Sequence, residues 1–168
     1  MSSRIYLSRK GLVRLSNQRD QLREELKKST KEMGESVKRD NDLRENPEYM
    51  QLQTKVSYEL PNKISEITKI IDTHLLIENT EAIKNSCFDE ISLGMQVTLI
   101  DDTRSKRLIS IMGYEESSPS EGIVSYLTPV AKKLMHKSIG DEVKLPVLGK
   151  PVLYEIVNIE LSPYLTLH

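Results

Sequence analysis

In the first half of the chain, apolar residues recur at the spacing of an α-helix in two long stretches. Ser8 precedes the first stretch, where its hydroxyl can accept hydrogen bonds from the N–H groups of a first turn. Asn46 and Pro47 open the second, since Asn caps helices and Pro has no N–H to leave unpaired. In each stretch the apolar positions form a narrow seam suited to a partner helix. The seams are Leu12, Leu15, Leu22, Leu26 and Met33, and then Tyr49, Leu52, Val56, Leu60, Ile64, Ile67, Ile71 and Leu75.

Residues 39–49, between the two stretches, are rich in acidic and turn-forming residues and predict the tip of an antiparallel helical hairpin. About thirty residues per helix, at 1.5 Å each, predict an arm about 45 Å long. Ser29 and Ser36 continue the first seam, so the apolar contact is expected to thin toward the tip. Within a continuous helix Pro61 would cost about 3 kcal/mol, so we expect a kink or a break there.

From Ile91 onward the pattern changes to alternating, β-branched residues, which favours strands. Pro129 is placed to start one short helix, over 129–135. The predicted fold class is therefore α+β: an N-terminal antiparallel α-helical coiled-coil hairpin over residues 1–79, and a small antiparallel-sheet domain over residues 80–168. The strands are expected over 95–100, 107–111, 122–126, 143–145 and 152–159.

The composition removes several functional classes. With 24 Lys+Arg against 25 Asp+Glu, the chain has no globally basic surface for nucleic acid, so any such contact must be local. No Trp and a single Phe leave little material for stacking bases. The one cysteine, Cys87, excludes an intramolecular disulfide and a multi-cysteine zinc site. Neither a membrane span nor a signal peptide is evident, so a cytoplasmic protein without membrane partners is expected.

The acids of the tip have two interpretations. Asp42 and Glu45 are three residues apart, and a turn can aim both carboxylates at one point. Mg²⁺ takes oxygen ligands and often uses one or two carboxylates, so the pair would form a weak, open site that a partner completes. Alternatively, these acids are turn and cap residues, which residue chemistry alone favours.

Three motifs, in the same order along the chain, resemble the Gre transcript-cleavage factors of bacterial RNA polymerase, the GreA and GreB family. Residues 42–49 resemble the family's acidic tip, whose usual form is Asp-Leu-(basic)-Glu-Asn-x-Glu-Tyr. Residues 6–8, with Gly11, Leu15 and Leu22, resemble its opening helix. Residues 122–131 and 137–143 resemble its Ile-Ser-x-x-Ser-Pro and Gly-Asp-x-Val signature.

The resemblance implies a coiled coil followed by an FKBP-like domain, and a factor that inserts its coiled coil into the secondary channel of RNA polymerase. Asp42 and Glu45 match the acidic pair that helps hold a second Mg²⁺ and orients a water, which cuts the 3′ end of backtracked nascent RNA. By this resemblance the polymerase is the enzyme, and Mg²⁺ is shared with its active site rather than bound by the factor alone.

Further site residues follow from the same resemblance. Four basic residues near the tip would hold the phosphates of the extruded RNA, although such a cluster can equally be a solvated helix face. Three residues of the second half match the segment used to dock on the polymerase, although a helix start accounts for Pro129 equally well. The two sets are Lys38, Arg39, Arg44 and Lys55, and Ser125, Thr128 and Pro129.

Three alternatives remain. The nearest is a Gre-like channel binder that inhibits the polymerase without stimulating cleavage, for which the additional acid Asp40 would allow a different metal arrangement. A prolyl isomerase is disfavoured because its apolar and aromatic pocket would have only Phe88, at the border of the second half, and tyrosines to line it. A plain coiled-coil adaptor would tolerate replacement of the tip acids.

Overall fold

The computed structural model describes residues 3–39 and 45–165, and the chain divides into two units. The hairpin unit is Val13–Thr73, and the sheet unit combines the residues up to Leu12 with those from His74 onward. The predicted boundary between residues 79 and 80 therefore lies beyond the end of the hairpin unit. The first twelve residues belong with the sheet, because β1 (Tyr6–Leu7) pairs in parallel with β2 (Leu75–Leu76).

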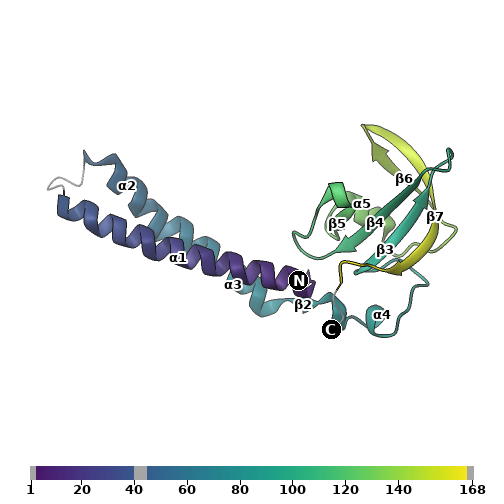
Figure 1. Ribbon diagram of the computed structural model, residues 1–168, viewed down its shortest axis with the longest axis horizontal. Coiled ribbons are helices and arrows are strands. Elements are labelled where there is room, and N and C mark those ends of the chain that lie inside the picture. Colours follow the sequence, from purple (N-terminus) through teal and green to yellow (C-terminus); the bar gives the residue numbers. More distant parts are fainter. Residues whose placement is uncertain (1–2, 40–44, 166–168) are drawn as a thin grey trace. The chain divides into compact units, whose positions relative to one another are not determined.

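The hairpin unit consists of two antiparallel helical segments (Figure 1). α1 (Arg9–Arg39) begins in the sheet unit and continues through the hairpin unit. The returning segment is α2 (Pro47–Thr54), a π-helical turn, η2 (Lys55–Glu59), and α3 (Leu60–Thr73). The predicted seam closes on Leu15 and Leu60, which are buried, while Ser29 and Ser36 are also buried, so the helices meet there on small side chains.

The expected interruption at Pro61 takes the form of the π-helical turn. Within the turn the backbone follows a wider path, and the N–H of Leu60 donates to the carbonyl of Lys55, five residues back. Pro61 follows immediately, as the second residue of α3. Proline has no N–H and crowds the preceding turn, so the wider turn accommodates it without ending the returning segment. The prediction that the second seam reaches Leu75 was wrong, because α3 ends at Thr73 and Leu75 belongs to β2.

The sheet unit contains a five-stranded sheet in the order β5-β4-β3-β7-β6. Four neighbours pair as three antiparallel ladders, but β5 pairs in parallel with β4, which corrects the expected fully antiparallel arrangement. The parallel pairing follows from the β4–β5 connection, which crosses back through the 3-10 turn η4 (Pro119–Glu121). The strands are β3 (Met95–Ile100), β4 (Lys106–Met112), β5 (Ile123–Ser125), β6 (Glu142–Val147) and β7 (Lys150–Leu161).

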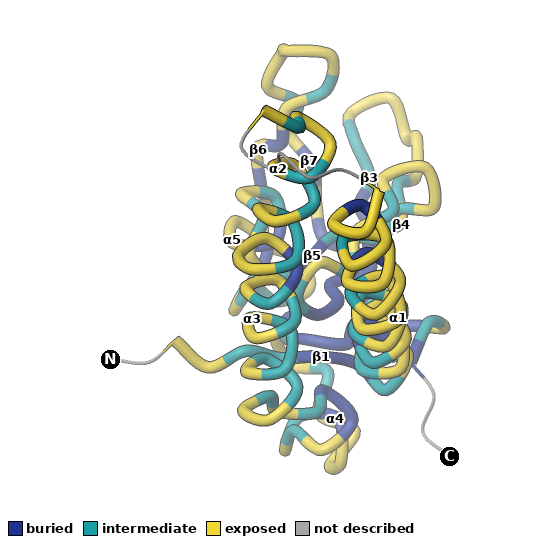
Figure 2. The backbone as a smooth tube through the Cα atoms, turned by 90° about the vertical axis from the view of Figure 1, so that its left-hand side faces the viewer, coloured by how far each residue is buried: buried dark blue, intermediate teal, exposed yellow. Residues whose placement is uncertain are grey.

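One face of this sheet forms the core. Met95, Val97 and Leu99 alternate along β3 and are fully buried, as a strand with one covered face requires. The predicted short helix is confirmed as α5 (Pro129–Leu134), and its Ala131 and Leu134 join the core. In Figure 2 the strands of the sheet unit carry dark blue, buried segments, whereas α1 and α3 are mostly yellow and teal. Two short helical turns, η3 (Ile77–Asn79) and α4 (Glu81–Lys84), follow β2.

Within residues 3–39 and 45–165, no helix combines the length and the apolar character needed to cross a membrane.

Candidate functional site

The residues that begin α2 tie the end of the hairpin together. Asn46 is the N-cap, as predicted, and its side-chain oxygen accepts a hydrogen bond from the N–H of Tyr49 at 3.2 Å. The Asn46 amide also donates to the hydroxyl of Ser36, on α1, at 3.5 Å. Pro47 follows at the first helical position and Glu48 lies in the first turn, near the positive end of the helix dipole. The chain leaving the tip is therefore anchored to both helical segments.

Of the predicted acidic pair, Glu45 is exposed and directly precedes the Asn46 cap. Asp42 lies outside the described residues, as do Asp40 and Arg44. Glu45 makes no ion pair within the described ranges, and those ranges contain no group of three or more His, Cys, Asp or Glu that could hold a metal ion.

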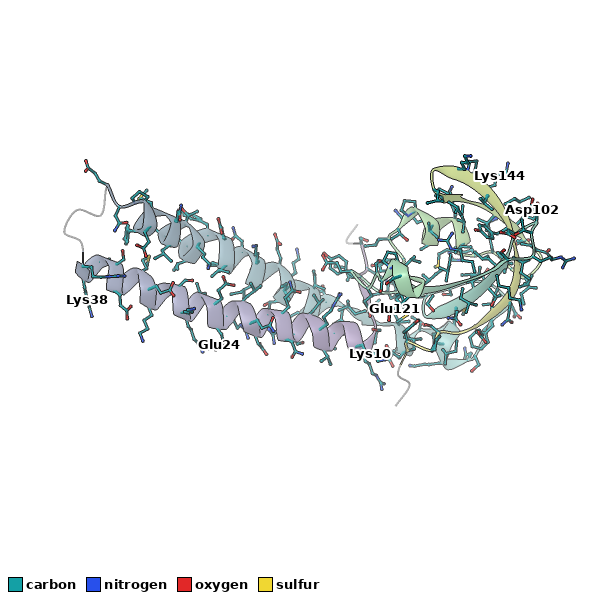
Figure 3. The ribbon with its side chains drawn as sticks, turned by 45° about the horizontal axis from the view of Figure 1, so that its top comes forward. Lys10, Glu24, Lys38, Asp102, Glu121 and Lys144 are labelled. Carbon is teal, nitrogen blue, oxygen red and sulfur yellow. The ribbon has the colours of Figure 1, made fainter. Side chains whose placement is uncertain are left out.

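The structure separates the predicted basic residues into two places. Lys38 and Arg39 are exposed in the last turn of α1, and Lys38 is visible at the tip end of that helix in Figure 3. Lys55 instead forms an ion pair with Glu25 across the hairpin, with Nζ and Oε1 2.7 Å apart. At 1.5 Å per residue, Glu25 lies about 21 Å along α1 from Arg39. Lys38 and Arg39 are therefore brought to the tip, whereas Lys55 is placed well away from them.

The Lys55–Glu25 contact also changes the acidity of both groups. The hydrogen bond from Lys55, with its positive charge, lowers the pKa of Glu25, and the same hydrogen bond raises the pKa of Lys55. Both side chains are substantially exposed, so the pair contributes little to stability in ordinary salt.

The predicted docking residues lie where β5 leads into α5. Thr128 caps α5: its hydroxyl accepts from the N–H of Ala131 at 3.3 Å and donates to the carbonyl of Ser125 at 2.8 Å. Ser125 is buried, and its N–H donates to the Ser117 hydroxyl at 2.9 Å. Pro129 is exposed at the first position of α5. Ser125 and Thr128 thus hold the backbone of this segment through hydrogen bonds, while the side chain of Pro129 is exposed to solvent.

Sequence reasoning missed the side chains that make up the exposed surface of this segment. Leu127 is 43% exposed, and Lys132 and Lys133 are exposed on α5. No sequence signal marked Leu127 as exposed, because an apolar residue before an N-cap often packs against the helix that follows.

These observations define a two-unit α+β protein in which an anchored helical hairpin presents a carboxylate and two basic side chains at its end. Residues 85–161 match the family model described as transcription elongation factor, GreA/GreB, C-term. The chain is 30% identical over 154 residues to the transcription elongation factor GreA of Nautilia profundicola, covering 91% of this chain and 92% of that protein. It is 30% identical over 161 residues to the GreA of Rickettsia canadensis, covering 95% and 96%. The chain therefore belongs to the GreA/GreB family of transcription elongation factors.

Solved structures give a weaker similarity. Gfh1, the GreA factor homolog 1 of Thermus thermophilus, is 19% identical with a TM-score of 0.42, covering 94% of this chain and 99% of that one. A GreA/GreB elongation factor from Nitrosomonas europaea is 15% identical with a TM-score of 0.41, covering 66% and 88%. At these values the structural similarity does not discriminate between functions.

Proposed function

We propose that this protein enters the secondary channel of bacterial RNA polymerase with its hairpin and stimulates endonucleolytic cleavage of backtracked nascent RNA, the polymerase being the enzyme. The observation that carries the proposal is the exposed Glu45, held beside the Asn46 cap at the end of a long hairpin, in a chain of the GreA/GreB family. α1 alone, at 1.5 Å per residue, is about 46 Å long, which is enough to reach into a deep channel.

Asp42 and Glu45 are the residues proposed to act on the scissile phosphate region. When shared with the polymerase site, Mg²⁺ would supply charge stabilisation at the attacking and leaving oxygens. The Glu45 carboxylate would accept a hydrogen bond from the attacking water and so orient it toward the phosphorus. An exposed carboxylate is suited to this role because it is free to join ligands that the partner brings.

Lys38 and Arg39 are proposed to hold phosphates of the extruded RNA 3′ end. Both are exposed at the tip end of α1, and such contacts are independent of RNA sequence and weaken as salt rises. Arg44 is assigned the same role from the motif. Lys55 stays a candidate only if it exchanges its ion pair with Glu25 for an RNA phosphate.

The β5–α5 segment is proposed to dock on the polymerase. Pro129 contributes exposed surface, while Ser125 and Thr128 act by fixing the backbone through their hydrogen bonds. The exposed Leu127 lies within the same segment and would add apolar area to the contact.

The decisive experiment is cleavage of 3′-labelled RNA in stalled, backtracked complexes of the cognate polymerase. We expect Mg²⁺-dependent release of short 3′ fragments, lost in Asp42→Asn/Glu45→Gln while binding to the polymerase persists. The matched control is Glu24→Gln/Glu66→Gln, which removes the same charge from exposed positions of the hairpin away from the tip.

Binding of the unmodified protein without cleavage would overturn this function and favour a channel binder that inhibits the polymerase. Equal cleavage by the unmodified protein and Asp42→Asn/Glu45→Gln would instead remove the acids from the mechanism.

A further inference from the structure

Two glutamates far away in the sequence hold the first turn of α1. The N–H of Ser8 donates to Glu116 Oε2 at 3.0 Å, and the Ser8 hydroxyl donates to Glu116 Oε1. The N–H of Arg9 donates to Glu78 Oε1 at 2.9 Å. The N–H of Gly11 donates back to the Ser8 hydroxyl oxygen at 3.0 Å. Glu78 and Glu116 are separated by 69 and 108 residues from the groups they bind.

This arrangement answers two needs of a helix N-terminus at once. The first N–H groups of a helix have no partners within it, and the aligned peptide dipoles make this end positive. Carboxylates satisfy both needs, because they accept hydrogen bonds and carry negative charge. Ser8 is completely buried and Glu116 is half-buried, so the bonds between them are partly shielded from water, and this shielding strengthens them.

Two glycines, Gly11 and Gly113, leave the space that the Glu116 carboxylate occupies. A Cβ added to Gly11 would lie 2.6 to 2.8 Å from the three atoms of that carboxyl group. A Cβ added to Gly113 would lie 2.1 Å from Glu116 Oε2 and 2.7 Å from the carbonyl oxygen of Tyr6. Since real Cβ atoms do not approach other atoms so closely, larger residues would displace the carboxylate. The space for the carboxylate thus depends on one glycine in the first turns of α1 and one directly after β4.

Glu78 is the second support. It is 5% exposed, and its Oε2 has no hydrogen-bond partner within the described residues. Burying an unpartnered carboxylate oxygen is unfavourable. The other oxygen of Glu78 accepts the Arg9 N–H, so this buried side chain holds the start of α1.

We propose that Glu116, supported by Glu78, is a positioning residue for the cleavage reaction. The inference rests on the proposed function. α1 runs without interruption from Arg9, which these carboxylates hold, to Lys38 and Arg39 at its other end. The held first turn therefore belongs to the same helix as these two basic residues, and displacements near 1 Å at a reacting centre can cost about a hundredfold in rate.

The test separates binding from turnover in the backtracked-complex assay. Glu116→Ala should lower the cleavage rate at saturating factor about tenfold or more, while the concentration for half-maximal cleavage changes less than about threefold. Glu116→Gln, which keeps a carbonyl oxygen as an acceptor, should recover part of the rate. The matched control is Glu121→Ala, which removes an exposed glutamate from the same unit (Figure 3) and should leave the rate unchanged.

Gly11→Ala fills the space occupied by the Glu116 carboxylate without changing Glu116 itself. Alone it should lower the saturating cleavage rate as Glu116→Ala does, because the added methyl group occupies the carboxylate's place. Combined with Glu116→Ala it should add no further loss, since the clashing group is gone. Gly34→Ala, with nothing within 4 Å of the added Cβ, is the control for a glycine replaced elsewhere in α1.

Amide hydrogen exchange supplies a readout independent of the polymerase. The Ser8 amide, which loses its acceptor, should exchange at least tenfold faster in Glu116→Ala, while the amides of β3 stay protected. Faster exchange at Ser8 with an unchanged saturating rate would overturn the positioning role alone. No cleavage by the unmodified protein would overturn the proposed function and this inference with it. If Glu116→Ala fails to fold, Glu116→Gln and Gly11→Ala decide on the same criteria.

Discussion

The hairpin unit and the sheet unit are stabilised by different means. In the sheet unit, alternating strand residues and α5 enclose a continuous apolar core. In the described part of the hairpin unit, Leu15 and Leu60 are the only apolar residues that are fully covered, and Ser29 and Ser36 occupy the other buried positions. A buried leucine surrounded on all sides contributes more than one covered by a single partner helix. The comparison teaches that apolar burial, and with it stability, is concentrated in the sheet unit, whereas the hairpin unit has long helices that bury few apolar side chains.

The largest expected effect tests this contrast with two matched leucines. Leu99→Ala, at a fully buried position of β3, should lower the free energy of unfolding by about 2–5 kcal/mol. Leu22→Ala, at a half-buried seam position, should lower it by less than about 2 kcal/mol, because less apolar area is uncovered. Urea denaturation followed by circular dichroism measures both. Equal losses at the two positions would break the contrast.

A second prediction concerns the cap of α5. Thr128→Ala should destabilise the sheet unit by about 1 kcal/mol, because the N–H of Ala131 loses its acceptor. Thr128→Ser keeps the hydroxyl and should restore most of the loss. Thermal unfolding monitored in the far ultraviolet distinguishes them, and a Thr128→Ala protein as stable as the unmodified one would show that the cap is dispensable.

A third prediction concerns helix propensity, which should affect stability more in the hairpin unit because little apolar burial supports its helices. Gly34→Ala should stabilise α1 by up to about 1 kcal/mol, since an alanine loses less backbone freedom on folding and its Cβ meets nothing within 4 Å. Helix content and the urea midpoint should both rise. A decrease in either would indicate that Gly34 is needed for a contact beyond those within this chain.

The smallest expected effect is the pH dependence of the Glu25–Lys55 pair. The pKa of Glu25 is lowered below 4.5, so its contribution to stability is complete above that pH and is lost as pH falls through the lowered value. The pKa of Lys55 is raised above 10.5, so its contribution is complete below that pH and is lost as pH rises through the raised value. The melting temperatures of Glu25→Gln and the unmodified protein should therefore differ slightly at pH 7, and the difference should shrink as pH falls through the lowered pKa of Glu25.

The control for that measurement is Glu24→Gln. The Glu24 carboxylate pairs with Lys27 within α1, at 2.7 Å, and does not cross to the returning segment. Its variant should lose only a local helix interaction at pH 7. If Glu24→Gln and Glu25→Gln behave alike, the pair across the hairpin adds nothing to its closure.

Features specified by short stretches of sequence were predictable. β3 spans the expected residues 95–100, and α5 starts at the expected Pro129, because alternation and a proline helix start act over a few residues. The Asn46 cap was predicted on the same grounds and is confirmed. The acidic tip was identified by its motif alone; of its acidic pair, Glu45 is exposed and Asp42 lies outside the described residues.

Features that depend on distant segments were decided by the tertiary structure. The parallel pairing of β5 with β4, the departure of Leu75 from the seam and the pairing of Lys55 with Glu25 each required a partner that local pattern does not specify. Ser8 was predicted as a cap, but its own partner, Glu116, lies 108 residues away. Hydrophobic periodicity determines which face of an element is covered. The identity of the group that covers or binds it depends on how the chain closes its long loops.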